Sequence, residues 1–263
     1  MLRINRVKDR IRTGETVYGP FLKCSAPQLV EVMGNAGFDF VLIDMEHGPH
    51  TTETVEGLIR AANVANFDAI IRVPENRENA ILKALDGGAH GILVPHVSTA
   101  GEARQVVIAA KFAPEGERGM DIYARSSGFG EVPKGDYLRQ ANETTLVAIQ
   151  IEGAEGVKNL GDILKVPGID VIFVGPYDLS QSIGIPGQID HPDLVAKVKE
   201  IVDLAREAGK AVGIYVDTPE AARRWRALGV QFIAISVDVA IFDQACRRMV
   251  ADLKEGSAFA IKH

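Results

Sequence analysis

The chain has 263 residues, of which 46% are hydrophobic and 24% charged, and its formal net charge is −6. This composition is typical of a soluble globular protein, and the lack of a basic stripe argues against nucleic acid and anionic membranes as partners. The charged start and the absence of an apolar run of ~20 residues predict neither a secretion signal nor a membrane span. Two isolated cysteines, Cys24 and Cys246, indicate free thiols, so we expect a cytoplasmic protein.

A short pattern recurs along the chain: a helical segment, a glycine, and then a continuous apolar run. The glycine fits the left-handed residue that ends a helix, and strands that are apolar on both faces are typical of a covered parallel sheet. Eight strands are predicted, near residues 17–22, 40–44, 69–73, 91–95, 146–151, 171–174, 211–216 and 231–236.

Eight βα units in one chain of this length predict a single (β/α)8 TIM barrel over residues 1–263, with a doubly wound open sheet as the alternative. Helix starts are predicted at Thr218-Pro219 and at His191-Pro192, and Thr99 with Glu102 fits a capping box. The Gly-rich, polar stretch 112–143 is predicted to be a loop insertion near the active site.

Polar side chains gather where the predicted strands end, which is where TIM barrels carry their catalytic residues. In chain order these positions hold Asp44, Glu46, His47, Arg72, His96, Gln150, Glu152, Asp178, Ser236 and Asp238. Some of these residues are expected only to cap the helix that follows, because Asp and Ser are preferred there.

Arg72 ends an apolar strand, where a permanent charge needs an anionic partner. Glu152 and Asp178 follow adjacent strands, and two neighbouring carboxylates repel unless a cation lies between them. This donor set suits Mg²⁺ or Mn²⁺, with water and substrate oxygens completing the coordination. A zinc site at His47-x-x-His50 is an alternative, but it lacks a clear third ligand.

Six stretches together, "FVLIDMEHGPH", "IIRVPEN", "ALDGGAHGILVPHV", "PEGERG", "VAIQIEG" and "VGPYDLS", resemble the HpcH/HpaI aldolase family. The resemblance runs in order over nearly the whole chain. It implies a barrel of the phosphoenolpyruvate/pyruvate type. It also implies a class II, metal-dependent aldolase that reversibly cleaves 4-hydroxy-2-oxo acids to pyruvate and an aldehyde, through a pyruvate enolate stabilised by Mg²⁺ or Mn²⁺, with Co²⁺ as a further candidate.

The resemblance also assigns roles to individual residues. It implies metal ligands at Glu152 and Asp178, and catalytic roles for Arg72, for His47 and for Asp86, the aspartate paired with that histidine. Substrate binding is expected at Arg72, Gln150, Gly175, Pro176, Tyr177 and Asp178. The family forms hexamers, so a homo-oligomer is expected, with "AIFDQACRRMVADL" (240–253) as the helix exchanged between subunits.

Three alternatives stay open at this point. A class I aldolase would form a Schiff base, and Lys23 is the lysine at a predicted strand end. A citramalyl-CoA-type lyase would need a CoA site, for which no nucleotide motif is visible. A non-catalytic binding barrel would bind neither metal nor pyruvate. The identity of the aldehyde is not legible in the sequence.

Overall fold

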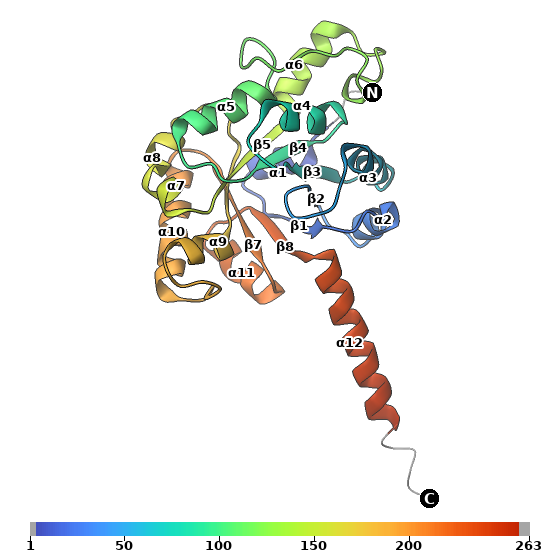
Figure 1. The fold of residues 1–263 in the computed structure, drawn as a ribbon, viewed down its shortest axis with the longest axis vertical. Helices are drawn as coiled ribbons and strands as arrows, with labels where there is room; N and C mark the ends of the chain where they lie inside the picture. The colour runs from blue at the N-terminus through green and yellow to red at the C-terminus, as the bar shows by residue number, and fades with distance from the viewer. Residues whose placement is uncertain (1–3, 258–263) are drawn as a thin grey trace, which may run out of the picture.

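The computed structural model describes residues 4–257, whose eight parallel strands close into one barrel in chain order (Figure 1). The strands are β1 (Val17–Leu22), β2 (Phe40–Asp44), β3 (Asp68–Arg72), β4 (Gly91–Val94), β5 (Leu146–Ile151), β6 (Val171–Val174), β7 (Ala211–Val216) and β8 (Phe232–Val237). Every predicted strand lies within one residue of these bounds. The (β/α)8 barrel is therefore confirmed, and the open sheet was wrong.

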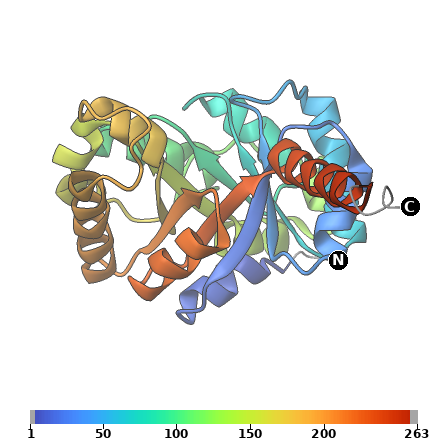
Figure 2. The same ribbon diagram turned by 90° about the horizontal axis from the view of Figure 1, so that it is seen from below.

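Helices cover the outside of the barrel and fill the connections between successive strands (Figures 1 and 2). They are α1 (Arg6–Arg12), α2 (Pro27–Asn35), α3 (Thr52–Val64), α4 (Glu78–Asp86), α5 (Ala100–Ala110), the 3₁₀ turn η1 (Arg125–Ser127), α6 (Lys134–Thr144), α7 (Ala154–Lys158), α8 (Leu160–Ile163), α9 (Pro176–Ser182), α10 (Pro192–Glu207), α11 (Pro219–Ala227) and α12 (Asp238–Ser257). The predicted caps are confirmed at Thr99, His191 and Thr218, whose side chains accept hydrogen bonds from the first turns of their helices.

The barrel interior is packed with side chains and closed at its amino end. The rings of Phe40 and Phe232 stack with centroids 4.2 Å apart, and Phe173 meets Phe232 edge-on. Val7 and Ile11 of α1 join this interior cluster from below the strands. Because side chains fill the interior, a substrate can reach polar groups only at the carboxyl ends of the strands.

The segment 112–143 has two features that were not predicted. It is not only a loop, because it contains η1 and most of α6, whose buried side chains Tyr137 and Asn142 hold it to the body of the chain. It also joins the end of α5 to the start of β5, so in this chain it lies at the amino ends of the strands. Within one chain the segment therefore lies on the rim opposite the mouth, since helix-to-strand connections run there, and its place near an active site stays a prediction.

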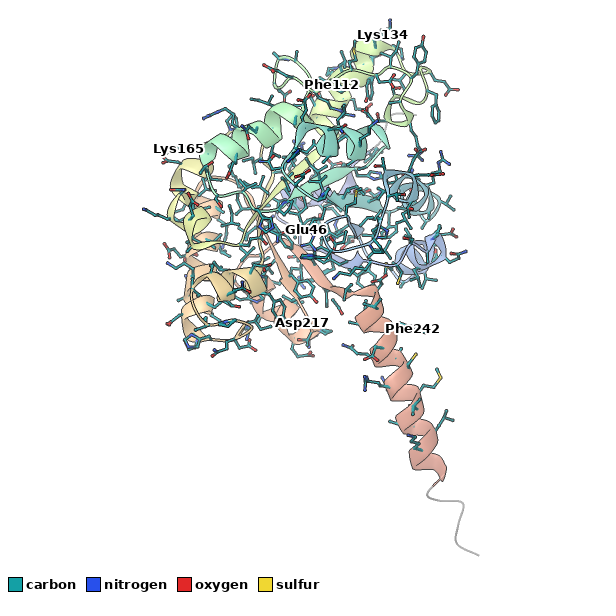
Figure 3. The ribbon with its side chains drawn as sticks, in the orientation of Figure 1. Glu46, Phe112, Lys134, Lys165, Asp217 and Phe242 are labelled. Carbon is teal, nitrogen blue, oxygen red and sulfur yellow. The ribbon has the colours of Figure 1, made fainter. Side chains whose placement is uncertain are left out.

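The helix α12 leaves the barrel and extends away from it (Figures 1, 2 and 3). Its first residue, Asp238, is buried, and its carboxylate accepts the backbone N–H groups of Lys23 and Cys24 at 3.1 and 2.7 Å. Farther along, large apolar side chains are exposed, among them Phe242 and Leu253, each with 70% of its surface accessible. No helix among residues 4–257 is long and apolar enough to cross a membrane.

Candidate active site

A cavity of about 320 Å³ opens at the carboxyl ends of the strands. It lies at the mouth of the barrel, and we call it the mouth cavity. Most residues predicted for the site line it: His47, Arg72, Gln150, Gly175, Pro176, Tyr177 and Asp178. The structure therefore brings together residues from the carboxyl ends of four strands, β2, β3, β5 and β6.

Arg72 is buried in the wall of the mouth cavity and is held by two carboxylates. Its Nε and Nη2 donate to Asp44 at 2.9 and 2.8 Å, and its Nη1 lies 3.0 Å from Oε2 of Glu46. Burial alone would raise the pKa of Asp44, but the hydrogen bonds and charge of Arg72 outweigh it, with help from two backbone N–H groups. The pKa of Asp44 is therefore lowered, and the guanidinium is fixed by an ionised partner.

His96 links two carboxylates across the mouth. Its Nε2 lies 2.9 Å from Glu46 and its Nδ1 lies 2.8 Å from Glu152. Its backbone N–H donates to the same Glu152 oxygen at 2.8 Å, and its φ of 57° is in the left-handed region that side chains rarely adopt. The sequence placed His96 at a strand end but gave no sign of this conformation, which directs both the ring and the N–H to the carboxylates.

Glu152 has a buried side chain and lies beside a glycine that leaves room for a ligand. Burial raises the pKa of Glu152, although His96 and Gln150 partly offset the effect. A Cβ added to Gly175 would lie 2.9 Å from Oε2 of Glu152 and 3.0 Å from Nε2 of Gln150, so a side chain there would fill this space. The buried Oε1 of Gln150 has no hydrogen-bond partner among the described residues.

These features fit a divalent metal ion. Glu152 directly follows β5, and Asp178 lies on the first turn of α9 after the neighbouring strand β6, with Gly175 between them. Within residues 4–257 no group of three or more His, Cys, Asp or Glu side chains is arranged to hold a metal. Two carboxylates and an unpaired amide oxygen suit a hard cation such as Mg²⁺ or Mn²⁺, which takes further ligands from water and substrate.

The other wall of the mouth cavity is aromatic. The phenols of Tyr177 and Tyr215 both donate to Asp217, at 2.7 and 3.0 Å (Asp217 is labelled in Figure 3). Burial and the Asp217 carboxylate raise the pKa of Tyr177 to about 12. Phe21 lies next to Tyr215 with ring centroids 5.8 Å apart, and the guanidinium of Arg72 lies 4.7 Å above the Phe21 ring.

The two histidines of the His47-x-x-His50 pair have different environments. His47 is exposed, lines the mouth cavity, and is positioned through its backbone N–H, which donates to Asp44 at 3.2 Å. His50 is buried, and its two ring nitrogens contact Ser25 Oγ at 3.0 Å and the carbonyl of Leu22 at 3.1 Å. Because both nitrogens are occupied, His50 does not serve as a zinc ligand here.

Asp86 does not lie with the other predicted residues in this chain. It ends α4, four residues before His90 and the start of β4, and so lies toward the amino ends of the strands. Its carboxylate accepts from Arg118 at 2.7 Å. The family resemblance pointed to this residue but not to the rim of the barrel on which it lies.

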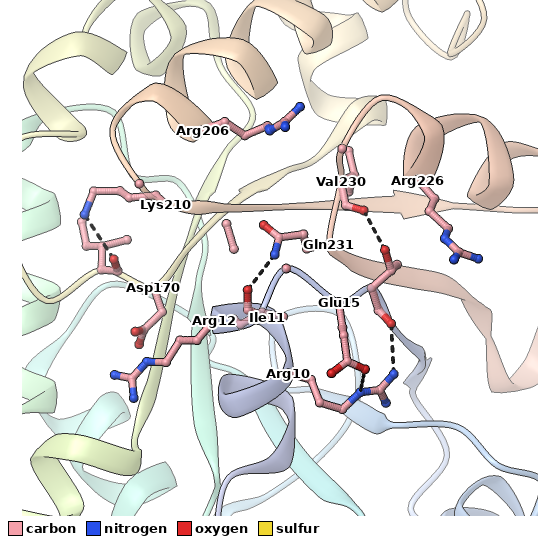
Figure 4. A pocket seen from close by; sticks show the side chains of 16 residues that line it. Arg10, Ile11, Arg12, Glu15, Asp170, Arg206, Lys210, Arg226, Val230 and Gln231 are labelled. Carbon is pink, nitrogen blue, oxygen red and sulfur yellow. Dashed lines mark hydrogen bonds and ion pairs between the residues drawn. The ribbon is translucent and has the colours of Figure 1, made fainter.

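A larger cavity of about 790 Å³ opens at the amino ends of β6, β7 and β8, and we call it the amino-rim cavity (Figure 4). Arg12, Arg206 and Arg226 line it from the last turns of α1, α10 and α11. Lys210 donates to the carbonyls of Val166 and Ile169. None of the predicted site residues lies there.

Known proteins resemble this chain over most of its length. The sequence profile of the HpcH/HpaI aldolase/citrate lyase family matches residues 18–245. A 2-keto-3-deoxy-L-rhamnonate aldolase from Escherichia coli O17:K52:H18 is 35% identical over 256 residues, which cover 97% of this chain and 95% of that protein. A hydroxypyruvate/pyruvate aldolase from Roseobacter denitrificans is 36% identical over 254 residues, which cover 96% and 98%.

Among solved structures, an HpcH/HpaI aldolase/citrate lyase family protein from Burkholderia cenocepacia J2315 superimposes with a TM-score of 0.90. It is 34% identical, and the match covers 95% of this chain and 99% of that one. Residues 18–245, which the family profile matches, include every residue of the mouth cavity.

Proposed function

Because the chain belongs to the HpcH/HpaI aldolase/citrate lyase family and is a carbon–carbon lyase, we propose that it is a class II pyruvate aldolase. Its reaction is the reversible cleavage of 4-hydroxy-2-oxo acids to pyruvate and an aldehyde. The observation that carries the proposal is the position of Arg72, held by Asp44 and Glu46 in the same cavity wall as the end of β5. The fixed guanidinium of Arg72, close to the proposed metal ligands Glu152 and Asp178, suits a reaction that builds negative charge on a keto oxygen.

Arg72 is the residue that meets the developing charge. Two of the five N–H donors of its guanidinium bind Asp44, and Nη1 forms an ion pair with Glu46, so donors remain for a substrate. When pyruvate loses a methyl proton, charge moves to the keto oxygen, and a hydrogen bond from Arg72 strengthens as it does so. A divalent ion held by Glu152 and Asp178, Mg²⁺ or Mn²⁺ with Co²⁺ as a further candidate, would supply Lewis acidity to the same oxygen.

The turn from Gly175 to Asp178 is proposed to hold the pyruvate carboxylate. In the first turn of α9 the backbone N–H groups of residues 177 and 178 have no partner within the helix. Gly175 leaves the approach to Glu152 open, and Gln150 fixes one oxygen of Glu152 with its side-chain N–H.

His47 is proposed to move the proton. In the neutral form its imidazole can take a methyl proton from pyruvate, and in cleavage it can take the proton of the C4 hydroxyl. The aspartate that the family resemblance pairs with His47 is Asp86, which lies toward the opposite rim and binds Arg118. A pairing of these two residues would therefore need the Asp86 of a second copy of the chain.

The exposed apolar side chains of α12 support the expected homo-oligomer, with a hexamer proposed from the family resemblance. A helix of 20 residues with large apolar side chains in water is poorly stabilised alone, so exchange between subunits would give it a packed environment. Light scattering of the full chain and of a variant that ends before α12 tests this. A monomeric full chain would contradict the proposal.

The proposed activity is tested with pyruvate, Mg²⁺ or Mn²⁺, and a panel of aldehydes, with the 4-hydroxy-2-oxo acid product followed by NMR. Exchange of the pyruvate methyl protons without aldehyde reports the first step alone. Lys23 also lines the cavity, which keeps the Schiff-base alternative testable. Borohydride with pyruvate should leave no adduct on Lys23, and mass spectrometry that finds one would overturn the class II assignment.

A further inference from the structure

Lys23 has a position that the proposed reaction does not use. It follows β1, its side chain lines the mouth cavity, and it is half-buried. Its backbone is held in place, since its N–H donates to Asp238 at 3.1 Å. A lysine whose main chain is fixed at a strand end presents its ammonium group to a defined part of the cavity.

The charge of Lys23 is not neutralised in the described part of the chain. The other cation in the cavity lining is Arg72, which Asp44 and Glu46 hold. No ion pair or side-chain hydrogen bond of Lys23 occurs among residues 4–257, so no carboxylate of the described residues offsets its charge, in contrast to that of Arg72. A partly desolvated ammonium group is stabilised when an anion binds beside it.

The wall that leads from Arg72 to Lys23 is apolar. Phe21 lies beneath the guanidinium of Arg72, and Lys23 follows two residues later, just after β1, so that both residues line the mouth cavity. Tyr215 packs on Phe21, and its hydroxyl is committed to Asp217. A ligand here meets ring faces first and a positive charge beyond them.

We propose that Lys23 determines the acceptor by binding an anionic group at the far end of the aldehyde. This inference rests on the proposed aldolase function, and it assigns Lys23 a non-covalent role. The preferred acceptor is an aldehyde with a short apolar chain that ends in a carboxylate or a phosphate. Its carbonyl faces the pyruvate enolate, and its anion reaches the ammonium of Lys23 along the wall of Phe21 and Tyr215.

The test compares acceptors that differ only in the anion. Succinic semialdehyde is paired with butanal, glyoxylate with glycolaldehyde, and glyceraldehyde 3-phosphate with glyceraldehyde. For the wild-type full chain with Mn²⁺ and pyruvate, we expect kcat/KM to be higher for the anionic member of at least one pair. The pair with the largest ratio identifies the anion as carboxylate or phosphate.

Lys23→Met keeps the length of the side chain and removes its charge. The ratio of kcat/KM for the anionic over the neutral acceptor should fall about 10–100-fold, the usual loss for one hydrogen bond to a charged group. Lys23→Arg should keep most of the ratio, because it retains a cation. Lys165→Met, on the outer surface where Lys165 pairs with Asp162, is the matched control and should leave the ratio as in wild type.

The outcomes separate this inference from the proposed function. A wild-type enzyme that prefers the neutral member of every pair, or a Lys23→Met ratio equal to the wild-type ratio, overturns the role of Lys23 while the aldolase function stands. Wild-type protein that fails to exchange pyruvate methyl protons overturns the aldolase function itself. If Lys23→Met does not fold, Lys23→Gln and the wild-type ratios decide the question.

Discussion

The two cavities at opposite ends of the barrel differ in how their charges are held. The mouth cavity is the smaller, about 320 Å³ against about 790 Å³, yet several charged groups at the mouth are buried. Arg72 and Asp44 are 8% and 0% accessible, and Glu152 is 6% accessible. At the amino rim, Arg12, Arg206 and Arg226 are exposed.

Folding explains one of these arrangements and not the other. Basic residues in the last turn of a helix interact favourably with its C-terminal dipole, and three helices end at the amino rim. Buried charges, by contrast, cost free energy even when they are paired. The size of a cavity is therefore a poor guide to function, and the retention of costly buried charges is a better one.

Removal of the metal should have the largest effect on activity, and the effect should arise at the mouth cavity alone. Chelation followed by desalting is expected to abolish retro-aldol activity, and Mg²⁺, Mn²⁺ or Co²⁺ to restore it, because Glu152 and Asp178 alone cannot stabilise a developing negative charge. Glu152→Gln and Asp178→Asn should lose Mn²⁺ binding, measured by titration calorimetry, with the fold retained by circular dichroism. Full activity in excess EDTA would contradict the proposed metal dependence of the reaction at the mouth cavity.

The next largest effect is expected at Arg72. Arg72→Ala should lower kcat/KM by ~10²–10³-fold, with a fall in kcat, as for oxyanion-hole donors. Arg72→Lys should recover little, because one ammonium does not reproduce the planar fork. Pyruvate methyl exchange should slow sharply while Mn²⁺ affinity stays near wild type. Normal exchange with impaired aldehyde addition would place Arg72 at the acceptor instead.

Asp68, at the amino end of β3, should affect stability and not activity. Burial raises the pKa of Asp68 to about 6, and its Oδ1 has no hydrogen-bond partner among the described residues. A raised carboxyl pKa favours the folded state below the unfolded pKa, and that contribution is lost as pH rises through about 6. Between pH 4 and pH 7.5 the wild type should therefore lose about 2 kcal/mol of unfolding free energy that Asp68→Asn does not lose. Urea unfolding at both pH values measures it, and equal pH dependence in both proteins would argue against a raised pKa.

The smallest effect is expected for Arg226→Ala, the matched control for Arg72→Ala. It removes the same group from the other cavity, so kcat/KM should stay within about twofold of wild type. Stability should fall by about 0.3–1 kcal/mol, and less at high salt, because the helix dipole is screened. A large loss of activity would show that the amino rim contributes to function.

The sequence was informative where one physical cause dominates. Continuous apolar runs gave all eight strands, and charges at buried strand ends pointed to Arg72, Glu152 and Asp178. The helix α6 was missed because it buries few side chains, chiefly Tyr137, and so lacks a clear apolar period. The role of His96 depends on a left-handed backbone that no local pattern announces.

Asp238 connects the long helix α12 to the mouth cavity. The carboxylate of Asp238, the first residue of α12, accepts hydrogen bonds from the backbone of Lys23 and Cys24. The start of α12 and the position of Lys23 therefore depend on the same residue. A change in the orientation of α12 would therefore reach Lys23, the residue proposed to select the aldehyde, over only a few bonds. In the proposed homo-oligomer, a neighbouring subunit that contacts α12 would therefore act close to Lys23.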